Sequence, residues 1–371
     1  MSSFIHTFEQ FNWEVVQQRI NDTNAKAVEN ALRKPKRNLQ DFMALLSPQA
    51  MPYLEEMAQL SHKITQGRFG KTIQLFAPVY VSNECQNICT YCGFSFTNHI
   101  PRKTLTEEEL LREVKVLKDL GFQHILIVSG EANYTVNIRY FSKAVALLKA
   151  YFANISIEVQ PLEQDEYEQL AQLGVHAVLV YQETYQRATY KSYHPKGKKS
   201  NFNYRLETPD RIGRAGIHKM GLGVLLGLSD WRTDSFFCAL HLDYLQKTYW
   251  KSKYAVSFPR MRPAEGIDWS GAVMSDRELV QLICAYRLWN SDLELSLSTR
   301  ESERFRDHAV KLGVTSMSAG SKTNPGGYAS DQGSLEQFSI DDNRSPAEVS
   351  QMIAATGYDP VWKDWEFMEE S

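Results

Sequence analysis

Three of the five cysteines lie within eight residues, at Cys85, Cys89 and Cys92. This spacing allows three thiolates to meet at one centre. A structural zinc site would normally need a second pair of Cys or His ligands at a typical spacing, and no such pair follows. Iron–sulfur clusters usually take four thiolates, so a cluster held by three would leave one iron open to another ligand. The pattern favours such a cluster, with a zinc site and ordinary thiols as the alternatives.

Length and charge narrow the class of protein. The chain has 371 residues, 43% hydrophobic and 23% charged, as in ordinary globular proteins. With a formal charge of −3, neither a nucleic acid nor an anionic membrane is an expected partner. No apolar run reaches the roughly 18 residues of a membrane span, and the N-terminal segment lacks the apolar core of a secretion signal. Cys238 and Cys284 are isolated, so we expect no disulfide framework and a location in the reducing cytoplasm.

From residue 73 the chain alternates short apolar, β-branched runs with amphipathic helical stretches. Strands that alternate with helices predict a parallel sheet, and eight such units over about 250 residues match a closed (β/α)8 barrel of the TIM type. An open doubly wound sheet is the alternative, but the G-x-G-x-x-G fingerprint is absent after the first strand. The predicted strands are Ile73–Val81, His124–Ser129, Ser156–Gln160, Ala177–Gln182, Leu222–Leu228, Tyr254–Pro259, Leu293–Ser298 and Thr315–Ala319.

Helical patterns fill the spaces between the strands and both flanks. We expect a helical extension over 1–70, the barrel over 71–320, and a C-terminal loop, helix and aromatic tail over 321–371 that packs back on the barrel. Thr106 and Glu109 have the spacing of a capping box. The predicted helices are Thr106–Leu120, Asn137–Phe152, Asp165–Leu173, Asp210–Met220, Asp234–Tyr249, Ser275–Trp289, Ser302–Leu312 and Ser345–Thr356.

In such a barrel, functional side chains gather at the C-terminal ends of the strands. There the sequence places Glu131, Glu158, Gln160, Glu183 and Arg300. Each has a structural alternative: Glu158 and Gln160 could satisfy each other, and Arg300 could pair with a nearby acid. Glu131 could be solvated, and Glu183 could cap a helix. As a set they suggest binding, because an arginine fork suits a carboxylate and carboxylates suit an ammonium or a ribose diol.

The segment Tyr190–Lys199 interleaves basic residues with tyrosines. Nucleic-acid binding is one interpretation, but the segment is short and the chain is slightly acidic. A solvated loop or a lid over the barrel mouth is the preferred interpretation, and His194 alone is no candidate ligand. Arg260 and Arg262, after the sixth strand, are expected to be structural or to face a partner.

In this setting the cysteine motif resembles that of the radical S-adenosylmethionine (SAM) enzymes. Tyr91 precedes the last cysteine, and the motif follows the first strand of a predicted barrel. Over essentially its whole length the chain further resembles the 2-iminoacetate synthases, the tyrosine lyases of thiamine biosynthesis. The segments that carry this resemblance are Gly130-Glu131, Glu158-Val-Gln160-Pro161, Tyr181-Gln-Glu183-Thr-Tyr185, Arg205-Leu-Glu-Thr-Pro-Asp210-Arg211, Ser298-Thr-Arg300-Glu301, Ser321–Tyr328 and Trp362-Lys-Asp-Trp365.

The resemblance implies two cofactors. The three cysteines would ligate a [4Fe–4S] cluster, and the amine and carboxylate of SAM would chelate its fourth iron. Glu131 would meet the SAM amine and Glu183 the ribose. Arg205 would pair with the SAM carboxylate, and Tyr91 would lie against the adenine.

The resemblance also implies a substrate and a reaction. Arg300 and Ser321 are similar in place to residues that hold the carboxylate of the substrate, and Gln160 is expected beside them. Reductive cleavage of SAM would give methionine and a 5′-deoxyadenosyl radical, which would take a hydrogen from the amine of L-tyrosine. The products would be 5′-deoxyadenosine, 2-iminoacetate and p-cresol, after cleavage of the Cα–Cβ bond. Thiazole synthase and a reduced electron donor such as flavodoxin are the implied partners.

Other functions remain open from the sequence. Hydrogenase-maturation tyrosine lyases carry a second cluster near the C-terminus, but the last cysteine here is Cys284. Biotin synthases need more barrel cysteines than Cys238 and Cys284 supply. A tryptophan lyase differs mainly in its pocket and stays possible. The alternative of a different class is a metal-bearing barrel that acts as a binding or electron-transfer module.

Overall fold

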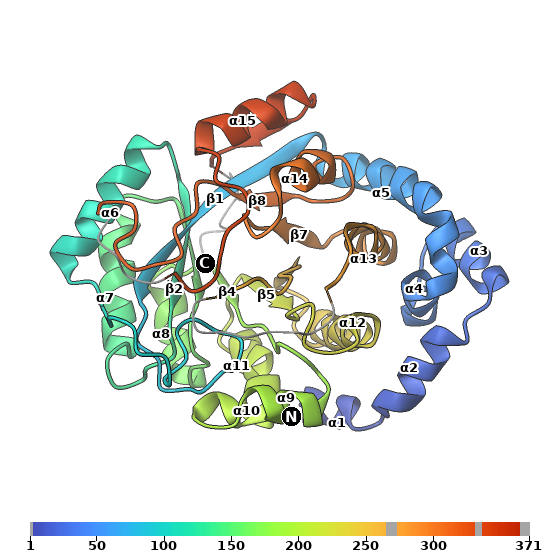
Figure 1. Cartoon of the computed structure of the whole chain (residues 1–371), viewed down its shortest axis with the longest axis horizontal. Coiled ribbons are helices and arrows are strands. Elements are labelled where there is room, and N and C mark those ends of the chain that lie inside the picture. Colours follow the sequence, from blue (N-terminus) through green and yellow to red (C-terminus); the bar gives the residue numbers. More distant parts are fainter. Residues whose placement is uncertain (1–2, 265–272, 331–335, 364–371) are drawn as a thin grey trace.

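The computed structural model describes residues 3–264, 273–330 and 336–363. Its centre is a closed barrel of parallel strands in the order β2-β3-β4-β5-β6-β7-β8-β1, closed by the pairing of β1 with β2. Helices surround the strands (Figure 1). The predicted (β/α)8 barrel is therefore confirmed. Its strands are β1 (Thr72–Ser82), β2 (His124–Ser129), β3 (Asn154–Glu158), β4 (Ala177–Leu179), β5 (Lys219–Gly223), β6 (Lys253–Ser257), β7 (Glu294–Leu297) and β8 (Ser316–Ser318).

The two faces of the strands divide the core. In β2, Ile125 and Ile127 join the main hydrophobic cluster together with side chains of the surrounding helices. Leu126 and Val128 alternate with them and join a smaller cluster, against which the partly buried Cys92 packs. Successive side chains of a strand point to opposite faces. One set of β2 side chains therefore packs against the outer helices, and the alternate set packs beside the cysteines.

The helices between the strands begin and end close to the predicted residues. Thr106 and Glu109 form the expected capping box, and similar boxes start α13 and α15. These helices are α6 (Glu107–Asp119), α7 (Ile138–Lys149), α8 (Gln164–Gln172), α11 (Thr208–Arg214), α12 (Trp231–Thr248), α13 (Asp276–Trp289), α14 (Glu303–Ala309) and, after the barrel, α15 (Pro346–Ala355).

The boundary between α11 and β5 was predicted wrongly, and β4 and β5 end before the predicted Gln182 and Leu228. The helix expected to reach Met220 ends at Arg214, and β5 begins at Lys219 instead of Leu222. Lys219 is buried, and its ammonium lies 2.9 Å from a carboxylate oxygen of Glu294 at the start of β7. A lysine at a strand start looks solvated in the sequence, but here a carboxylate two strands away allows it to be buried.

The segment Tyr190–Lys199 was expected to be a loop, and it is partly helical instead. It runs from α9 (Arg187–Tyr193) to the 3-10 turn η2 (Lys198–Ser200), and α10 (Phe202–Leu206) follows. Tyr190 and His194 are fully buried. These two side chains are therefore packed into the protein, whereas the lysines at 191, 196 and 198 are exposed.

The chain before the barrel forms helices that lie along the outer side of α12 and α13 (Figure 1). After the barrel, β9 (Asp359–Val361) pairs with the start of β1, and the Trp362 ring packs edge-on against Phe122. Trp365 lies outside the described residues. Among the residues that the structure describes, no helix is long and apolar enough to cross a membrane. The preceding elements are α1 (Phe4–Phe8), α2 (Trp13–Asn21), α3 (Ala25–Arg33), α4 (Leu39–Leu46), η1 (Pro48–Tyr53) and α5 (Leu54–Phe69).

Phe42 provides a test of how firmly the N-terminal helices are attached. Its ring is fully buried, and the ring centroids of Tyr286 and Trp289 on α13 lie 4.9 and 5.3 Å away. Phe42→Ala should lower the free energy of unfolding by about 3–5 kcal/mol in urea denaturation, as for other buried phenylalanines. Val15→Ala, at a side chain that is 46% exposed, is the control and should change it by less than about 0.5 kcal/mol. Equal effects of the two variants would show that the helices do not depend on this contact.

Candidate functional site

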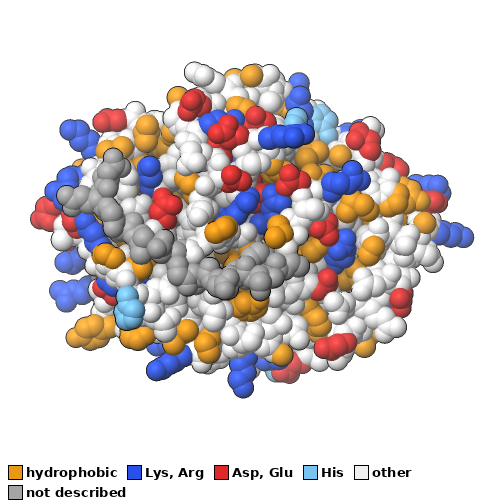
Figure 2. Space-filling view, viewed as in Figure 1, with side chains coloured by type: hydrophobic (Ala, Val, Ile, Leu, Met, Phe, Trp, Pro, Cys, Tyr) orange, Lys and Arg blue, Asp and Glu red, His pale blue; other side chains and the backbone are white. Residues whose placement is uncertain are grey.

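The three clustered cysteines follow β1 and line one cavity at the C-terminal mouth of the barrel, together with Glu131, Glu183 and Arg205. A second cavity adjoins it and contains Arg300 and Ser321. On the face of the molecule shown in Figure 2, acidic and basic side chains lie close together near the centre, among hydrophobic ones. The structure therefore brings most of the predicted site residues to one end of the barrel.

The cysteine loop is held by the side chain of Arg102. Arg102 donates hydrogen bonds to the carbonyls of Asn83, Phe94, Ser95 and Asn98, at 2.7–3.1 Å. One guanidinium thus satisfies four carbonyl groups that no strand or helix pairs. Such a frame fixes the loop and with it the direction of the three thiols.

The chemistry of the three thiol donors suits an iron–sulfur cluster. Within the part of the chain that the structure describes, no three His, Cys, Asp or Glu side chains are arranged to hold one metal ion. The cysteines instead lie around a shared cavity, which suits a group of several irons. Burial, and then Glu131, raises the pKa of the Cys85 thiol to about 11, and this thiol would lose its proton on binding iron.

Four largely buried charges lie beside the cysteines, with side chains 7–13% exposed. Arg205 donates to Glu131 at 2.8 Å and to Glu183 at 3.4 Å, and the Lys199 ammonium donates to Glu183 at 2.7 Å and lies 3.9 Å from Glu131. Asn87 connects this group to the cysteine loop, since its amide donates to Glu131 and accepts from the Lys199 backbone, both at 2.9 Å. The four charges sum to zero, which offsets the desolvation free energy that each charge alone would cost when it is removed from water.

Glu183 is held in an unusual conformation. Its φ of 70° makes it the one non-glycine residue with positive φ in the described ranges. Backbone strain of this kind costs of order 1–3 kcal/mol and gathers at functional sites. Burial alone would raise the pKa of Glu183, but Lys199 and Arg205 outweigh it and hold that pKa below the ordinary value. Glu183 is therefore an ionised carboxylate whose direction is fixed by its neighbours.

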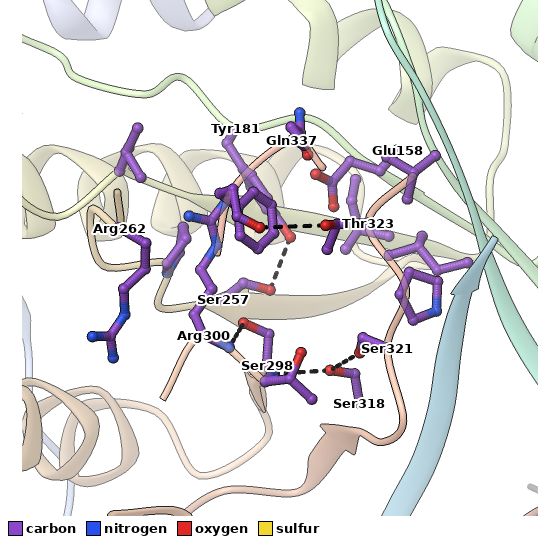
Figure 3. A pocket seen from close by; sticks show the side chains of 18 of the residues that line it. Glu158, Tyr181, Ser257, Arg262, Ser298, Arg300, Ser318, Ser321, Thr323 and Gln337 are labelled. Carbon is purple, nitrogen blue, oxygen red and sulfur yellow. Dashed lines mark hydrogen bonds between the residues drawn. The ribbon is translucent and has the colours of Figure 1, made fainter. Parts of the chain in front are cut away.

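The adjoining cavity has a cation on one wall and hydroxyl groups on another (Figure 3). The Arg300 guanidinium carbon lies 3.3 Å from the centroid of the Phe338 ring, and one of its N–H groups approaches the Arg260 carbonyl at 3.4 Å. Ser321 donates to the Ser318 hydroxyl at 3.1 Å. These groups can receive a carboxylate.

Other expectations for this region have mixed outcomes. Gln160 lines neither cavity, because β3 ends at Glu158 and the Gln160 amide turns to the Val136 carbonyl. Gln160 and Glu158 therefore do not satisfy each other. Arg260 forms a buried ion pair with Glu301, which makes it structural as expected.

Tyr91 lines the cavity that contains Arg300. Its hydroxyl lies 2.7 Å from Nε2 of the buried His194. Burial lowers the pKa of His194 to about 3, so the imidazole is neutral and can share one proton with the phenol. The position of Tyr91 is thus fixed from the side of α9.

Lys199 is the site residue that the sequence interpretation missed. Its side chain is 12% exposed and lines both cavities. A close turn brings it there, because Gly197 has a φ of 98° and a Cβ at that position would lie 2.2 Å from the Asn87 side-chain oxygen. The glycine before the two lysines was the available signal, since it marks a tight approach rather than a solvated basic run.

Lys199→Met tests the charge group in the protein without cofactors. The variant leaves Glu183 with a weaker partner, so the free energy of unfolding at pH 7 should fall by about 1–3 kcal/mol, as for a lost hydrogen bond to a charge. A carboxylate whose pKa is lower in the folded protein than in the unfolded chain stabilises the fold at every pH above its pKa in the unfolded chain. This stabilisation is lost as the pH falls through its pKa in the folded protein. The difference from wild type should therefore stay constant from pH 7 down to about pH 5 and shrink only as the pH falls below the ordinary glutamate pKa of about 4.3. Lys198→Met, at the exposed neighbour, is the control, and an equal loss there would contradict this account.

Comparison with known proteins assigns the family. A model of the radical SAM superfamily matches residues 79–237, and one of the biotin and thiamin synthesis associated domain matches 257–359. The chain is 50% identical to 2-iminoacetate synthase of Escherichia coli over 367 residues, which cover 99% of this chain and 97% of that protein.

Solved structures agree with this assignment. The crystal structure of HydG, a maturase of the [FeFe]-hydrogenase, is similar with a TM-score of 0.89 at 30% identity, covering 94% of this chain and 80% of that one. HydG from Carboxydothermus hydrogenoformans gives 0.87 at 29% identity, covering 95% and 84%. The cysteine loop, the barrel and these likenesses agree, and the chain belongs to the 2-iminoacetate synthases, a family of carbon–carbon lyases within the radical SAM superfamily.

Proposed function

We propose that this protein cleaves the Cα–Cβ bond of L-tyrosine to give 2-iminoacetate and p-cresol, with methionine and 5′-deoxyadenosine from SAM. The observation that carries the proposal is the pair of adjoining cavities, one lined by the three cysteines and the other by Arg300 and Ser321. The identity of 50% to a 2-iminoacetate synthase over nearly the whole chain supports it. The match to a thiamin synthesis associated domain supports a role in making the thiazole moiety of thiamine.

The residues present suit both cofactors. The three cysteines would hold one [4Fe–4S] cluster with an open iron for SAM, and when bound these groups supply the 5′-deoxyadenosyl radical. Glu131 would receive the amine of SAM and Glu183 its ribose hydroxyls. Arg205 would pair with its carboxylate and Tyr91 would lie against its adenine. Carboxylates and a guanidinium are the groups that such a polar ligand requires.

The protein itself would bind, orient and shield the substrate. Arg300 would pair with the tyrosine carboxylate, and the Ser321 hydroxyl would donate to it. Apolar side chains of the same cavity, such as Phe76, Leu126 and Leu179, would exclude water from the aromatic part. Holding an amino acid in one geometry beside a radical source supplies much of the rate advantage, because the reacting atoms no longer have to find each other.

The product suggests partners. An imine such as 2-iminoacetate hydrolyses easily, so thiazole synthase would receive it in a protein complex. A reduced electron donor such as flavodoxin would supply the electron for each cleavage of SAM. Both partners, and a cytoplasmic location with its low redox potential, belong to the proposal.

Cys89→Ala tests the cluster. The wild-type protein, purified and reconstituted without oxygen, should be brown with about four iron atoms per chain and should release 5′-deoxyadenosine in a tyrosine-dependent way. Cys89→Ala should lose the iron and all cleavage of SAM, whereas Cys238→Ala, at a thiol buried in the main core, should keep both. A colourless wild-type protein that contains zinc would contradict the proposed function.

Arg300→Ala tests the substrate site. It should weaken tyrosine binding by roughly 2–5 kcal/mol, as expected when one member of a buried charge pair is removed, while SAM affinity stays as in wild type. Calorimetry without a reductant measures both affinities in the absence of turnover. Arg68→Ala is the control, at a half-exposed arginine near the start of β1. Unchanged tyrosine affinity in Arg300→Ala would refute the assignment of this residue.

A further inference from the structure

Glu158 lies at the wall that the two cavities share. It stands at the end of β3, and it lines both the cavity with the cysteines and the cavity with Arg300. A side chain in this position can touch a ligand in the substrate cavity at the point nearest to the cofactor cavity.

The basic side chains near Glu158 already form ion pairs with other carboxylates. Lys199 lies 2.7 Å from Glu183, and Arg205 lies 2.8 Å from Glu131. Glu158 itself forms no ion pair with a residue in the described part of the chain. It is a half-buried carboxylate that has a place for a cation and no protein cation to fill it.

Arg300 is the complementary group in the same cavity. Its guanidinium stacks on Phe338 at 3.3 Å, and among the described residues it has no carboxylate partner. Arg300 and Glu158 influence each other's pKa through space without forming an ion pair. Figure 3 shows both residues among the side chains around this cavity. A cation and an anion separated by an open space match the two charges on the α-carbon of an amino acid.

We propose that Glu158 receives the α-amino group of the substrate while Arg300 receives its carboxylate. This inference rests on the proposed function and deepens it. With two charged anchors, the α-carbon is fixed between them, and the amine lies at the wall next to the cofactor. The nitrogen is thereby brought closer to the cofactor cavity than the rest of the substrate.

Glu158 can also take a proton from the amine. A free amino acid carries an ammonium group near neutral pH, whereas removal of a hydrogen atom is easier from a neutral amine. Transfer of one proton to the carboxylate gives the neutral amine and a protonated Glu158, with no change in total charge. Burial, and then the neighbouring Glu183, raises the pKa of Glu158 to about 7, which suits a group that exchanges a proton under these conditions.

Glu158 hydrogen-bonds with the hydroxyl of Tyr181. That hydroxyl also lies 3.0 Å from the Ser257 hydroxyl, and the amide oxygen of a glutamine at position 158 can still accept a hydrogen bond from it. Glu158→Gln keeps the size and polarity of the side chain and removes only the charge. An unchanged affinity for S-adenosylhomocysteine would show that the variant retains the architecture of the mouth.

The test compares three ligands that differ in one charged group. Tyrosine has both groups, 3-(4-hydroxyphenyl)propionate lacks the amine, and tyramine lacks the carboxylate. Their dissociation constants are measured by calorimetry on the cluster-loaded protein with S-adenosylhomocysteine and no reductant. Glu158→Gln should weaken tyrosine and tyramine at least tenfold and leave 3-(4-hydroxyphenyl)propionate within twofold of wild type. Glu158→Asp should restore part of the loss, and Glu107→Gln, on the exposed side of α6, should change nothing.

Two results would overturn the inference in different ways. If Glu158→Gln weakens tyrosine and the amine-free ligand equally, or neither, then Glu158 does not receive the amine, although the proposed function stands. If the wild-type protein binds none of the three ligands, the substrate assignment fails and this inference fails with it.

Discussion

Charged groups that are withdrawn from water must neutralise one another, and the mouth of this barrel is built on that constraint. Glu131 and Glu183 follow β2 and β4, whereas Lys199 and Arg205 belong to the short helical segments between β4 and β5. Leaving any one of these buried charges unpaired would cost several kcal/mol. Their mutual attraction therefore fixes the helical segments against the barrel, and Asn87 extends the same network to the cysteine loop.

The same arrangement explains why the site can hold very polar ligands without opening to solvent. The carboxylates and cations are already oriented, so a bound ligand exchanges partners with them instead of with water, and little reorganisation is needed. Apolar residues of β2, which also anchor the outer helices, form the wall between this charged region and the strands behind it. Stability and binding thus use the same buried groups, and the strained backbone of Glu183 is part of what the surrounding charges hold in place.

The sequence predicted what depends on local patterns. The alternation of strands and helices indicated the barrel, and the cysteine spacing indicated the cluster loop, because both signals lie within short stretches of chain. Contacts between distant residues were not visible. Lys199 looked solvated within its basic run, yet two carboxylates from other strand ends bury it. Gln160 was expected in the site because it continues the alternation of β3, but the strand ends at Glu158 and the chain turns away.

In the proposed function, the two adjoining cavities form one active site for tyrosine. The most direct measurement is product analysis after anaerobic incubation of the reconstituted protein with SAM, a reductant and either L-tyrosine or L-tryptophan. We expect p-cresol from tyrosine and no indole product from tryptophan, because the chain belongs to the 2-iminoacetate synthase family, whereas the charged anchors would hold the α-amino and carboxylate groups of either amino acid. An indole product from tryptophan without p-cresol from tyrosine would contradict it.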